Sequence, residues 1–152
     1  MTPFEETVQS NWIDYNGHMN VAYYLLVFDH ASDTLLDQLE LGAAYRAQKN
    51  CSMFVVETHI TFDREVLEGE LLRVENRIVG YGDKRLHIYQ QMSGGATGEM
   101  AATNEVMLLH VDMSQRRTSR FPQGALDRIQ SIFNSQEKPE LPEGTGRSIR
   151  PC

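Results

Sequence analysis

The strongest hydrophobic pattern in the chain runs from residue 21 to residue 41, where apolar side chains recur every three or four positions. This spacing is typical of a helix that buries one face, and Gly42 supplies a stop signal. The first two turns are apolar all round, whereas acidic residues enter only in the later turns. We therefore expect one long helix whose N-terminal end is deeply buried and whose C-terminal end is half exposed.

The period changes to two in residues 54–62, where apolar and polar side chains alternate as in a β-strand. Further strands are expected at about 70–79, 85–92 and 100–111, joined by short turns rich in glycine and aspartate. Such short connections favour antiparallel neighbours. Residues 106–109 are apolar on both faces, so a helix or a second subunit is expected to cover the other side of the sheet.

The C-terminal part of the chain carries a second, shorter helical pattern over residues 124–133. Three prolines and few apolar residues follow it. We expect residues 1–137 to form one domain and residues 138–152 to form a tail that is loose or held by a neighbouring subunit.

Composition narrows the possible functions. The chain has 152 residues, 41% of them hydrophobic and 23% charged, which is ordinary for a folded globular protein. Its net charge of -7 argues against nucleic acid as a main partner. The apolar run that starts at residue 21 stops at Asp29, too short for a membrane span, and the acidic N-terminus does not resemble a signal peptide. We expect a cytoplasmic protein that does not bind membranes.

The residues that commonly bind metals do not form a recognisable motif. Cys51 and Cys152 have no metal-binding or disulfide spacing, and a reducing compartment suits them. The histidines outside the motif described next also lack metal spacing; they are His30, His59, His87 and His110. We expect neither a metal nor a cofactor.

The nine residues before the long helix contain the highest density of potentially catalytic side chains in the chain. Asp14, Asn16 and His18 occupy alternate positions, so in an extended segment their side chains would share one face. Gly17 would let backbone amides approach a ligand closely. The alternative is a turn in which Asp14, Asn16 or Asn20 merely caps the backbone at the start of the helix.

The order of these motifs along residues 4–121 resembles the hotdog-fold acyl-CoA thioesterases of the 4-hydroxybenzoyl-CoA type. Within that group, residues 12–19 and 28–36 look most like the thioesterases of carnitine breakdown, which act on betainyl-CoA. The resemblance rests on the Asp-x-Asn-Gly-His-x-Asn segment, the apolar helix with Tyr23 and Tyr24, the strand 54–62 and the segment from Glu65 to Glu70.

The resemblance implies an α+β hotdog fold, in which a curved antiparallel sheet wraps a long central helix, with a C-terminal helix and tail added here. It also implies a homodimer whose sheets join edge to edge, or a dimer of such dimers, with active sites at the dimer interface. In the family the motif aspartate is the catalytic carboxylate, which falls on Asp14. In related plant acyl carrier protein thioesterases an Asp-x-Asn-x-His trio serves, which falls on Asp14, Asn16 and His18.

A mechanism follows as a hypothesis. Asp14 attacks the thioester carbonyl or activates water, and the sequence does not choose between these roles. The additional acidic residue of the plant group cannot be located in this chain. Backbone amides near the helix start, with the side chain of Asn16 or His18, would polarise the carbonyl. The residues expected around the carbonyl are Gly17, Met19, Asn20 and Val21.

The two ends of an acyl-CoA substrate suggest further contacts. A betainyl group carries a quaternary ammonium, which favours aromatic faces or a carboxylate; the candidates are Trp12, Tyr15, Tyr23, Tyr24 and Glu57. Alternatively, these aromatic residues line the interface between helix and sheet. The phosphates of CoA favour cations, and the candidates are Lys84, Arg85, Arg116 and Arg117. These cations could equally be solvent-exposed neighbours of Asp83 or Asp112.

Two other functions compete with thioester hydrolysis. A hotdog hydratase or dehydratase usually carries Asp-x-x-x-x-His at the start of the helix, and nothing after Val21 supplies it. A non-catalytic acyl-CoA sensor would normally come with a basic DNA-binding segment, which is not visible either. Release of free thiol from a panel of acyl-CoAs would separate hydrolysis from binding alone.

Overall fold

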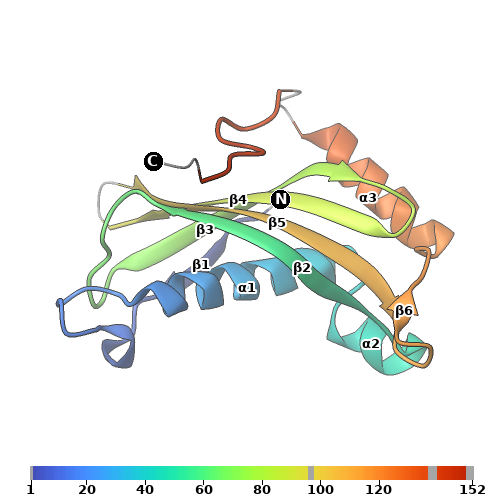
Figure 1. Cartoon of the computed structure of the whole chain (residues 1–152), viewed down its shortest axis with the longest axis horizontal. Coiled ribbons are helices and arrows are strands. Elements are labelled where there is room, and N and C mark those ends of the chain that lie inside the picture. Colours follow the sequence, from blue (N-terminus) through green and yellow to red (C-terminus); the bar gives the residue numbers. More distant parts are fainter. Residues whose placement is uncertain (1, 96–97, 137–139, 150–152) are drawn as a thin grey trace. The chain divides into compact units, whose positions relative to one another are not determined.

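The computed structural model describes residues 2–95, 98–136 and 140–149. Its strands form one sheet in the order β1-β3-β4-β5-β2, with β6 paired to β5 (Figure 1). The elements are β1 (Phe4–Thr7), the 3-10 turn η1 (Ser10–Trp12), α1 (Val21–Gln38), α2 (Ala43–Lys49), β2 (Cys51–Phe62), β3 (Leu71–Tyr81), β4 (Arg85–Gly94), β5 (Glu99–Asp112), β6 (Arg117–Thr118) and α3 (Gln123–Ser135). The expected α+β class is confirmed.

The sheet is antiparallel, as the short turns predicted. β1 pairs with β3 and β5 pairs with β6 in antiparallel register. Between β2 and β5, Asp63 donates to the carbonyl of Ala101 at 2.9 Å and Met113 donates to the carbonyl of Asn50 at 2.9 Å. Residue numbers that rise on one strand while they fall on the other require antiparallel strands. β2 stands at one end of the strand order.

The chain forms two compact units, and every long strand contributes to both. Unit 1 comprises residues 1–34, 60–76 and 90–104. In its core, buried residues of α1 pack against buried residues of the strands. These residues include Tyr24, Val27, Phe28 and Ala31 on the helix and Leu72, Val74, Met92 and Ala102 on the sheet.

A layer of buried amides crosses the core of unit 1. Gln90 is fully buried, and its Nε2 donates to the carbonyl of Phe28 at 3.0 Å and to Oδ1 of Asn76 at 2.8 Å. Its Oε1 accepts from Nδ2 of Asn104 at 2.7 Å. Asn76 in turn donates to the carbonyl of Ala31. Two strands are thereby hydrogen-bonded to α1 directly and β5 through Gln90, although no sequence pattern indicated it.

Unit 2 comprises residues 35–59, 77–89 and 105–152. The last part of α1 packs with the strands and with α3 through a second cluster of buried residues. These residues include Leu35, Leu36 and Leu39 on α1, Ile78, Leu86, Ile88, Val106 and Leu108 on the strands, and Ala125 and Ile129 on α3.

The long helix ends earlier than its pattern predicted. α1 stops at Gln38, and Glu40 adopts a left-handed backbone with φ of 55°. Gly42 caps the start of α2, a short helix that the sequence analysis missed. A Cβ atom at Gly42 would lie 1.9 Å from Oδ1 of Asp37, so a larger residue there would require the Asp37 side chain to move.

The prediction that the N-terminal end of α1 is deeply buried is wrong. Val21 is 62% exposed, and Leu25 and Leu26 are exposed as well. The core of unit 1 covers one face of the helix, and the stripe opposite starts apolar and becomes acidic at Asp29. The chain by itself therefore leaves apolar helix surface open to solvent.

The described part of the C-terminal tail, residues 140–149, makes hydrogen bonds to the chain's own sheet. Within unit 2, the hydroxyl of Tyr89 donates to the carbonyl of Glu143 at 3.0 Å. The N–H of Gly146 donates to Oε2 of Glu105 at 2.7 Å. Tyr89 and Glu105 belong to neighbouring strands, so the chain's own tail covers part of this sheet.

Candidate active site

The segment between η1 and α1 is a tight hairpin, and the expected extended conformation is wrong. Ile13 and Met19 form a β-bridge, and the N–H of Asp14 donates to the carbonyl of His18 at 3.0 Å. The N–H of Gly17 donates to the carbonyl of Asp14 at 3.0 Å, and Gly17 has φ of +85°. A three-residue hairpin loop with a left-handed glycine has these bonds, so the Asn-Gly pair turns the chain back.

The hairpin pairs two of the three predicted chemical residues. Met19 is 1% exposed and Ile13 packs against the core of unit 1, so this pair points inward. Asp14 and His18 form the next pair, and side chains of successive pairs alternate between faces. Asp14 and His18 therefore share the outer face as cross-strand neighbours. Asn16 lies at the exposed tip of the turn.

The Asp14 carboxylate has one oxygen engaged and one open. Its Oδ1 accepts the N–H of Asn16 at 2.7 Å, which is the bond of an Asx turn. Among the residues that the structure describes, nothing donates to Oδ2. Nδ1 of His18 lies 3.5 Å from the carbonyl of Met19, and its Nε2 faces no bonding partner in the same described part. A carboxylate oxygen and an imidazole nitrogen are thus available on one partly exposed face.

Asn20 has the role that the capping alternative predicted. Its Oδ1 accepts the N–H of Ala22 at 3.0 Å, which satisfies one of the free donors in the first turn of α1. This interaction sets where the helix begins directly after the hairpin.

The N–H of Gly17 is used inside the hairpin, and two more of the backbone amides proposed for the substrate carbonyl are also engaged. The N–H of Met19 donates to the carbonyl of Val66 at 2.7 Å, and the N–H of Asn20 donates to the carbonyl of Trp12 at 2.9 Å. Neither group is free to donate to a ligand in this structure. The N–H of Val21 makes no hydrogen bond within the described residues, so it is the open donor at the helix start.

The candidate aromatic residues separate into buried and exposed ones. Trp12 is 4% exposed and stacks on Tyr23, with ring centroids 5.3 Å apart. Tyr24 is buried, and its hydroxyl donates to the carbonyl of Arg64 at 3.2 Å. These residues line the helix–sheet interface, as the alternative interpretation predicted. Tyr15 is 97% exposed beside Asp14.

The four candidate cations lie at one end of the sheet in unit 2. Lys84 and Arg85 follow the turn between β3 and β4, while Arg116 and Arg117 follow β5, and all four are exposed. The carbonyl of Lys84 accepts the N–H of His110, which joins the two segments. The expected acidic neighbours have other partners: Asp83 pairs with Arg120 at 3.3 Å, and Oδ1 of Asp112 accepts backbone N–H groups. Glu57 is exposed on β2 of the same unit.

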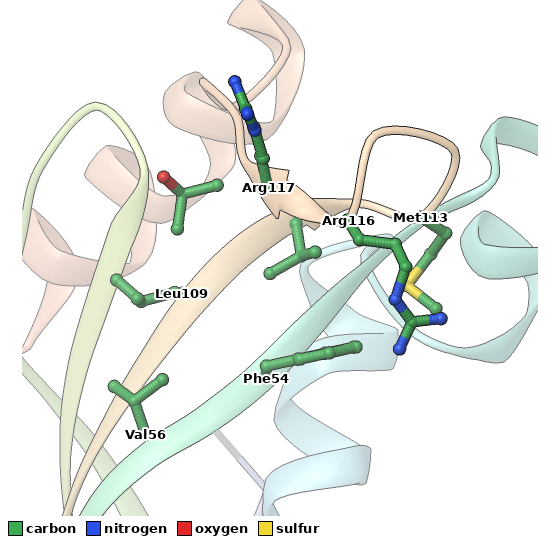
Figure 2. A pocket seen from close by; sticks show the side chains of 8 residues that line it. Phe54, Val56, Leu109, Met113, Arg116 and Arg117 are labelled. Carbon is green, nitrogen blue, oxygen red and sulfur yellow. The ribbon is translucent and has the colours of Figure 1, made fainter.

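A cavity of about 240 Å³ lies beside Arg116 and Arg117 (Figure 2). Apolar side chains of β2 and β5 form its floor, while the loop after β5 supplies Arg116 and β6 supplies Arg117 (Figure 2). Leu109 lines it while Leu108 packs in the core, so the cavity is on the sheet face opposite the core. The lining residues are Phe54, Val56, Leu109, Val111, Met113, Arg116, Arg117 and Thr118.

A buried polar cluster in unit 2 also escaped the sequence analysis. The hydroxyl of Tyr45 donates to Nε2 of His110 at 2.9 Å, and Nδ1 of His110 donates to the carbonyl of Ser119 at 3.0 Å. Burial lowers the pKa of His110, so its neutral form is favoured. Burial, followed by contact with Cys51, raises the pKa of Tyr45 to about 12.

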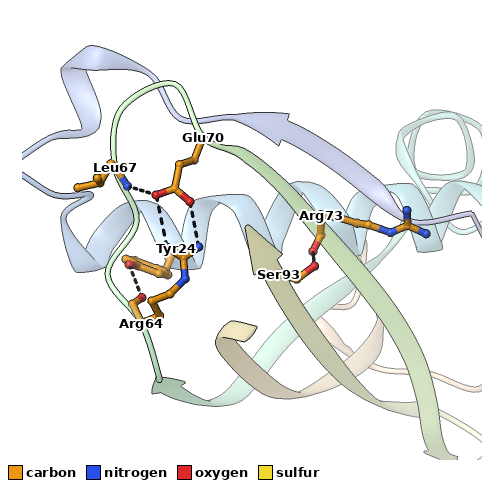
Figure 3. Close-up of polar contacts among 6 residues, drawn as sticks. All are labelled: Tyr24, Arg64, Leu67, Glu70, Arg73 and Ser93. Atoms are coloured by element: carbon orange, nitrogen blue, oxygen red, sulfur yellow. Dashed lines mark hydrogen bonds and ion pairs between the residues drawn. The ribbon is translucent and has the colours of Figure 1, made fainter. Parts of the chain in front are cut away.

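An ion pair in unit 1 joins the two ends of the loop between β2 and β3 (Figure 3). Nη2 of Arg64 donates to Oε2 of Glu70 at 2.9 Å, and Oε1 of Glu70 accepts the N–H of Leu67 at 2.9 Å. The hydrogen bond from Arg64 is the main reason that the pKa of Glu70 is lowered. The segment contributed to the family resemblance, but its spacing alone did not reveal this ion pair.

Among the residues that the structure describes, no group of three or more His, Cys, Asp or Glu side chains is arranged to hold a metal ion. Among the same residues, no helix has both the length and the apolar character needed to span a bilayer. Cys152, the second cysteine considered in the sequence analysis, lies outside the described residues.

The family match and the individual relatives found by sequence comparison agree with each other. Residues 8–129 match the family described as the Thioesterase-like superfamily. The betainyl-CoA thioesterase of Pseudomonas aeruginosa is 36% identical over 149 residues, which cover 98% of this chain and 94% of that protein. The L-carnitine dehydrogenase/betainyl-CoA thioesterase of Agrobacterium fabrum is 44% identical over 96% of this chain, which matches 30% of that longer protein.

Similarity also extends to three-dimensional structure. A Staphylococcus aureus protein solved in complex with CoA superposes with a TM-score of 0.92 and 29% identity. The match covers 99% of this chain and 94% of that one.

Proposed function

The chain belongs to the thioesterase-like superfamily, and from this premise we propose that it hydrolyses a small acyl-CoA, with betainyl-CoA as the preferred substrate. The hotdog fold and the thioester hydrolase activity expected from the resemblance are confirmed. The acyl group, the roles of individual residues and the assembly of subunits are our proposals.

The observation that carries the catalytic proposal is the open Oδ2 of Asp14 next to His18 on the outer face of the hairpin. A carboxylate with one oxygen held by its own turn is fixed in orientation while the other oxygen can react. The N–H of Val21 at the start of α1 supplies a donor for the negative charge that develops on the thioester oxygen. His18 can add a second donor through Nε2.

Two routes use the same groups. In the first, Oδ2 of Asp14 bonds to the acyl carbon while the carbon–sulfur bond breaks, and water then cleaves the mixed anhydride. In the second, Asp14 takes a proton from water as the water oxygen adds to the acyl carbon. CoA leaves as the thiolate in both routes, and neither requires a cofactor.

The chemistry of the acyl group supports an aromatic contact at Tyr15. A betainyl group presents a quaternary ammonium, and the 97% exposed ring of Tyr15 directly follows Asp14. We propose that Tyr15 contacts the cation, with the partly buried Tyr23 as a secondary candidate. The cations Lys84, Arg85, Arg116 and Arg117 stay candidates for the CoA phosphates because each is exposed.

We also propose that two chains join through β2. This strand ends the sheet, and Phe54, Val55 and Val56 are consecutive exposed apolar residues on it. An exposed apolar edge strand is a ready surface for pairing with another strand. A second subunit would also account for the exposed apolar start of α1, where Val21 and Leu25 face solvent.

Release of free thiol from betainyl-CoA and from tert-butylacetyl-CoA tests the activity and the substrate together. The second acyl group has the same shape but lacks the positive charge, so we expect a lower kcat/KM for it. Asp14→Asn should reduce kcat at least about a hundredfold while the protein stays folded. Near-normal turnover by this variant would reject the role of Asp14. Binding of both substrates without thiol release by the wild type would favour a sensor.

A hydratase or dehydratase, the other enzyme class considered in the sequence analysis, would change the acyl chain without releasing the thiol, so the same experiment distinguishes it from a thioesterase. The cytoplasmic location expected from cysteine use stays a prediction.

A further inference from the structure

We propose that the Glu70 side chain, which Arg64 holds in place, positions the hairpin that carries Asp14 and His18. It acts through one peptide group, the one that joins Val66 to Leu67. The inference rests on the proposed function, because the hairpin is the catalytic element only if Asp14 takes part in the reaction. All the residues involved belong to unit 1.

The peptide group between Val66 and Leu67 has both of its polar atoms engaged. Its carbonyl oxygen accepts the N–H of Met19 at 2.7 Å, and its N–H donates to Oε1 of Glu70 at 2.9 Å. A trans peptide is planar, and its C=O and N–H point in opposite directions. Any rotation that breaks the bond to Glu70 therefore also turns the carbonyl away from Met19.

Met19 connects this peptide group to the two residues proposed for catalysis. It follows His18 directly, and its β-bridge to Ile13 closes the hairpin. Ile13 in turn precedes Asp14. The hydrogen bond from Met19 to Val66 thus holds the inner pair of the hairpin, and the outer pair of Asp14 and His18 follows its placement.

Arg64 keeps the Glu70 carboxylate in position. The guanidinium bonds both carboxylate oxygens, with Nη2 to Oε2 at 2.9 Å and Nη1 to Oε1 at 3.4 Å (Figure 3). Nε of Arg64 is buried without a partner among the described residues, so Glu70 provides most of the compensation for this charge. The backbone of Arg64 is held as well, because its carbonyl accepts the hydroxyl of Tyr24 at 3.2 Å.

The neighbouring turn between β4 and β5 leaves little room for movement of the ion pair. A Cβ atom at Gly95 would lie 2.9 Å from Oε2 of Glu70, and one at Gly94 would lie 3.1 Å from Nη2 of Arg64. Glycines at both positions let the turn pack closely against the two charged groups. The side chains of Arg64 and Glu70 are only 27% and 16% exposed. The carboxylate is consequently held from two sides.

The test compares variants of Glu70 in the full-length protein with betainyl-CoA. Glu70→Ala removes the acceptor for the N–H of Leu67, so kcat should fall about ten- to a hundredfold, because small misplacements of catalytic groups carry such costs. KM should change less than about twofold. Glu70→Gln retains one oxygen that can accept from Leu67, so kcat should fall less than in Glu70→Ala, although its amide NH2 then faces Nη2 of Arg64 in place of Oε2.

Exchange of the Met19 amide hydrogen provides a readout independent of activity. It should be faster in Glu70→Ala than in Glu70→Gln, because only the former frees the peptide between Val66 and Leu67. Glu70→Asp carries the same test if Glu70→Ala does not fold, since its shorter side chain cannot reach Leu67 and Arg64 together. The matched control is Glu6→Ala, which breaks the 2.8 Å pair with His30 in the same unit, with Glu6 19% exposed. That variant should keep kcat.

The possible outcomes separate the two proposals. If Asp14→Asn is inactive but Glu70→Ala keeps its kcat and its Met19 protection, the positioning role is rejected and the catalytic proposal stands. Equal losses of kcat in Glu70→Ala and Glu70→Gln would also reject it, because the retained acceptor oxygen for Leu67 would then make no difference. If Asp14→Asn is active, the catalytic proposal fails, and faster Met19 exchange in Glu70→Ala would still support the mechanical link.

Discussion

Asp14 and His18 face each other across a three-residue turn, and the N–H of Asp14 donates a 3.0 Å hydrogen bond to the carbonyl of His18. The carboxylate and the imidazole are therefore placed by backbone pairing and not by contact between their side chains. A change that disturbs the turn should separate the two groups without altering either of them.

Gly17→Ala tests this dependence on the turn. A Cβ atom at Gly17 would meet nothing within 4 Å, so the cost is conformational and arises from φ of +85°. We expect a loss of about 1 kcal/mol in the free energy of unfolding and a lower kcat. Gly17→Asn should lose less, since asparagine tolerates the left-handed region better. Urea unfolding and thiol release measure both effects, and equal behaviour of the two variants would contradict the explanation.

Val55→Lys tests the proposed pairing of β2 strands. Val55 is 48% exposed on the strand at the end of the sheet, and lysine on an edge opposes pairing with a second edge. We expect the dimer dissociation constant, measured by analytical ultracentrifugation, to rise at least about tenfold. Leu141→Lys is the control, because Leu141 is 62% exposed in the tail and should not alter the mass. A wild-type protein that is monomeric at high concentration would reject the proposed pairing through β2.

Gln90→Leu tests the buried amide layer of unit 1. The substitution deprives Nδ2 of Asn104 and Oδ1 of Asn76 of hydrogen bonds in the core. We expect the free energy of unfolding to fall by about 2–3 kcal/mol in urea titrations. The double variant Gln90→Leu, Asn104→Leu should recover part of the loss, because both partners of one buried bond are then apolar. Additive losses would show that the two residues do not act together.

The His110 cluster predicts a dependence of stability on pH. Burial lowers the pKa of His110 below its usual 6.5, so the unfolded chain binds its proton more readily than the folded one. The stabilisation is complete above pH 6.5 and is lost as the pH falls through the window between 6.5 and the folded pKa. His110→Gln should be less stable at neutral pH and should show a flatter decline over that window. Denaturation followed at several pH values would reveal an unchanged slope if this account is incorrect.

The regular elements could be predicted because their signals are local. The helical spacing between residues 21 and 41 located α1, and the alternation in 54–62 located β2, to within a few residues. The short elements β1, β6 and α2 were missed because four, two or seven residues contain too few periods to stand out. The end of α1 was misplaced because Glu40, and not Gly42, leaves the helical conformation first.

The candidate site was also predicted only in part from the sequence. The sequence by itself determined the chemistry: a carboxylate, an imidazole and a glycine within five residues, ahead of a helix start. Only the tertiary structure decided which of these groups meet, because the hairpin pairs Asp14 with His18 and leaves Asn16 at the tip. It also decided that Glu70 and Val66, about fifty residues along the chain, hold the hairpin. Composition and spacing record which groups are present and their local periodicity, whereas hydrogen bonds between distant segments exist only once the core has brought those segments together.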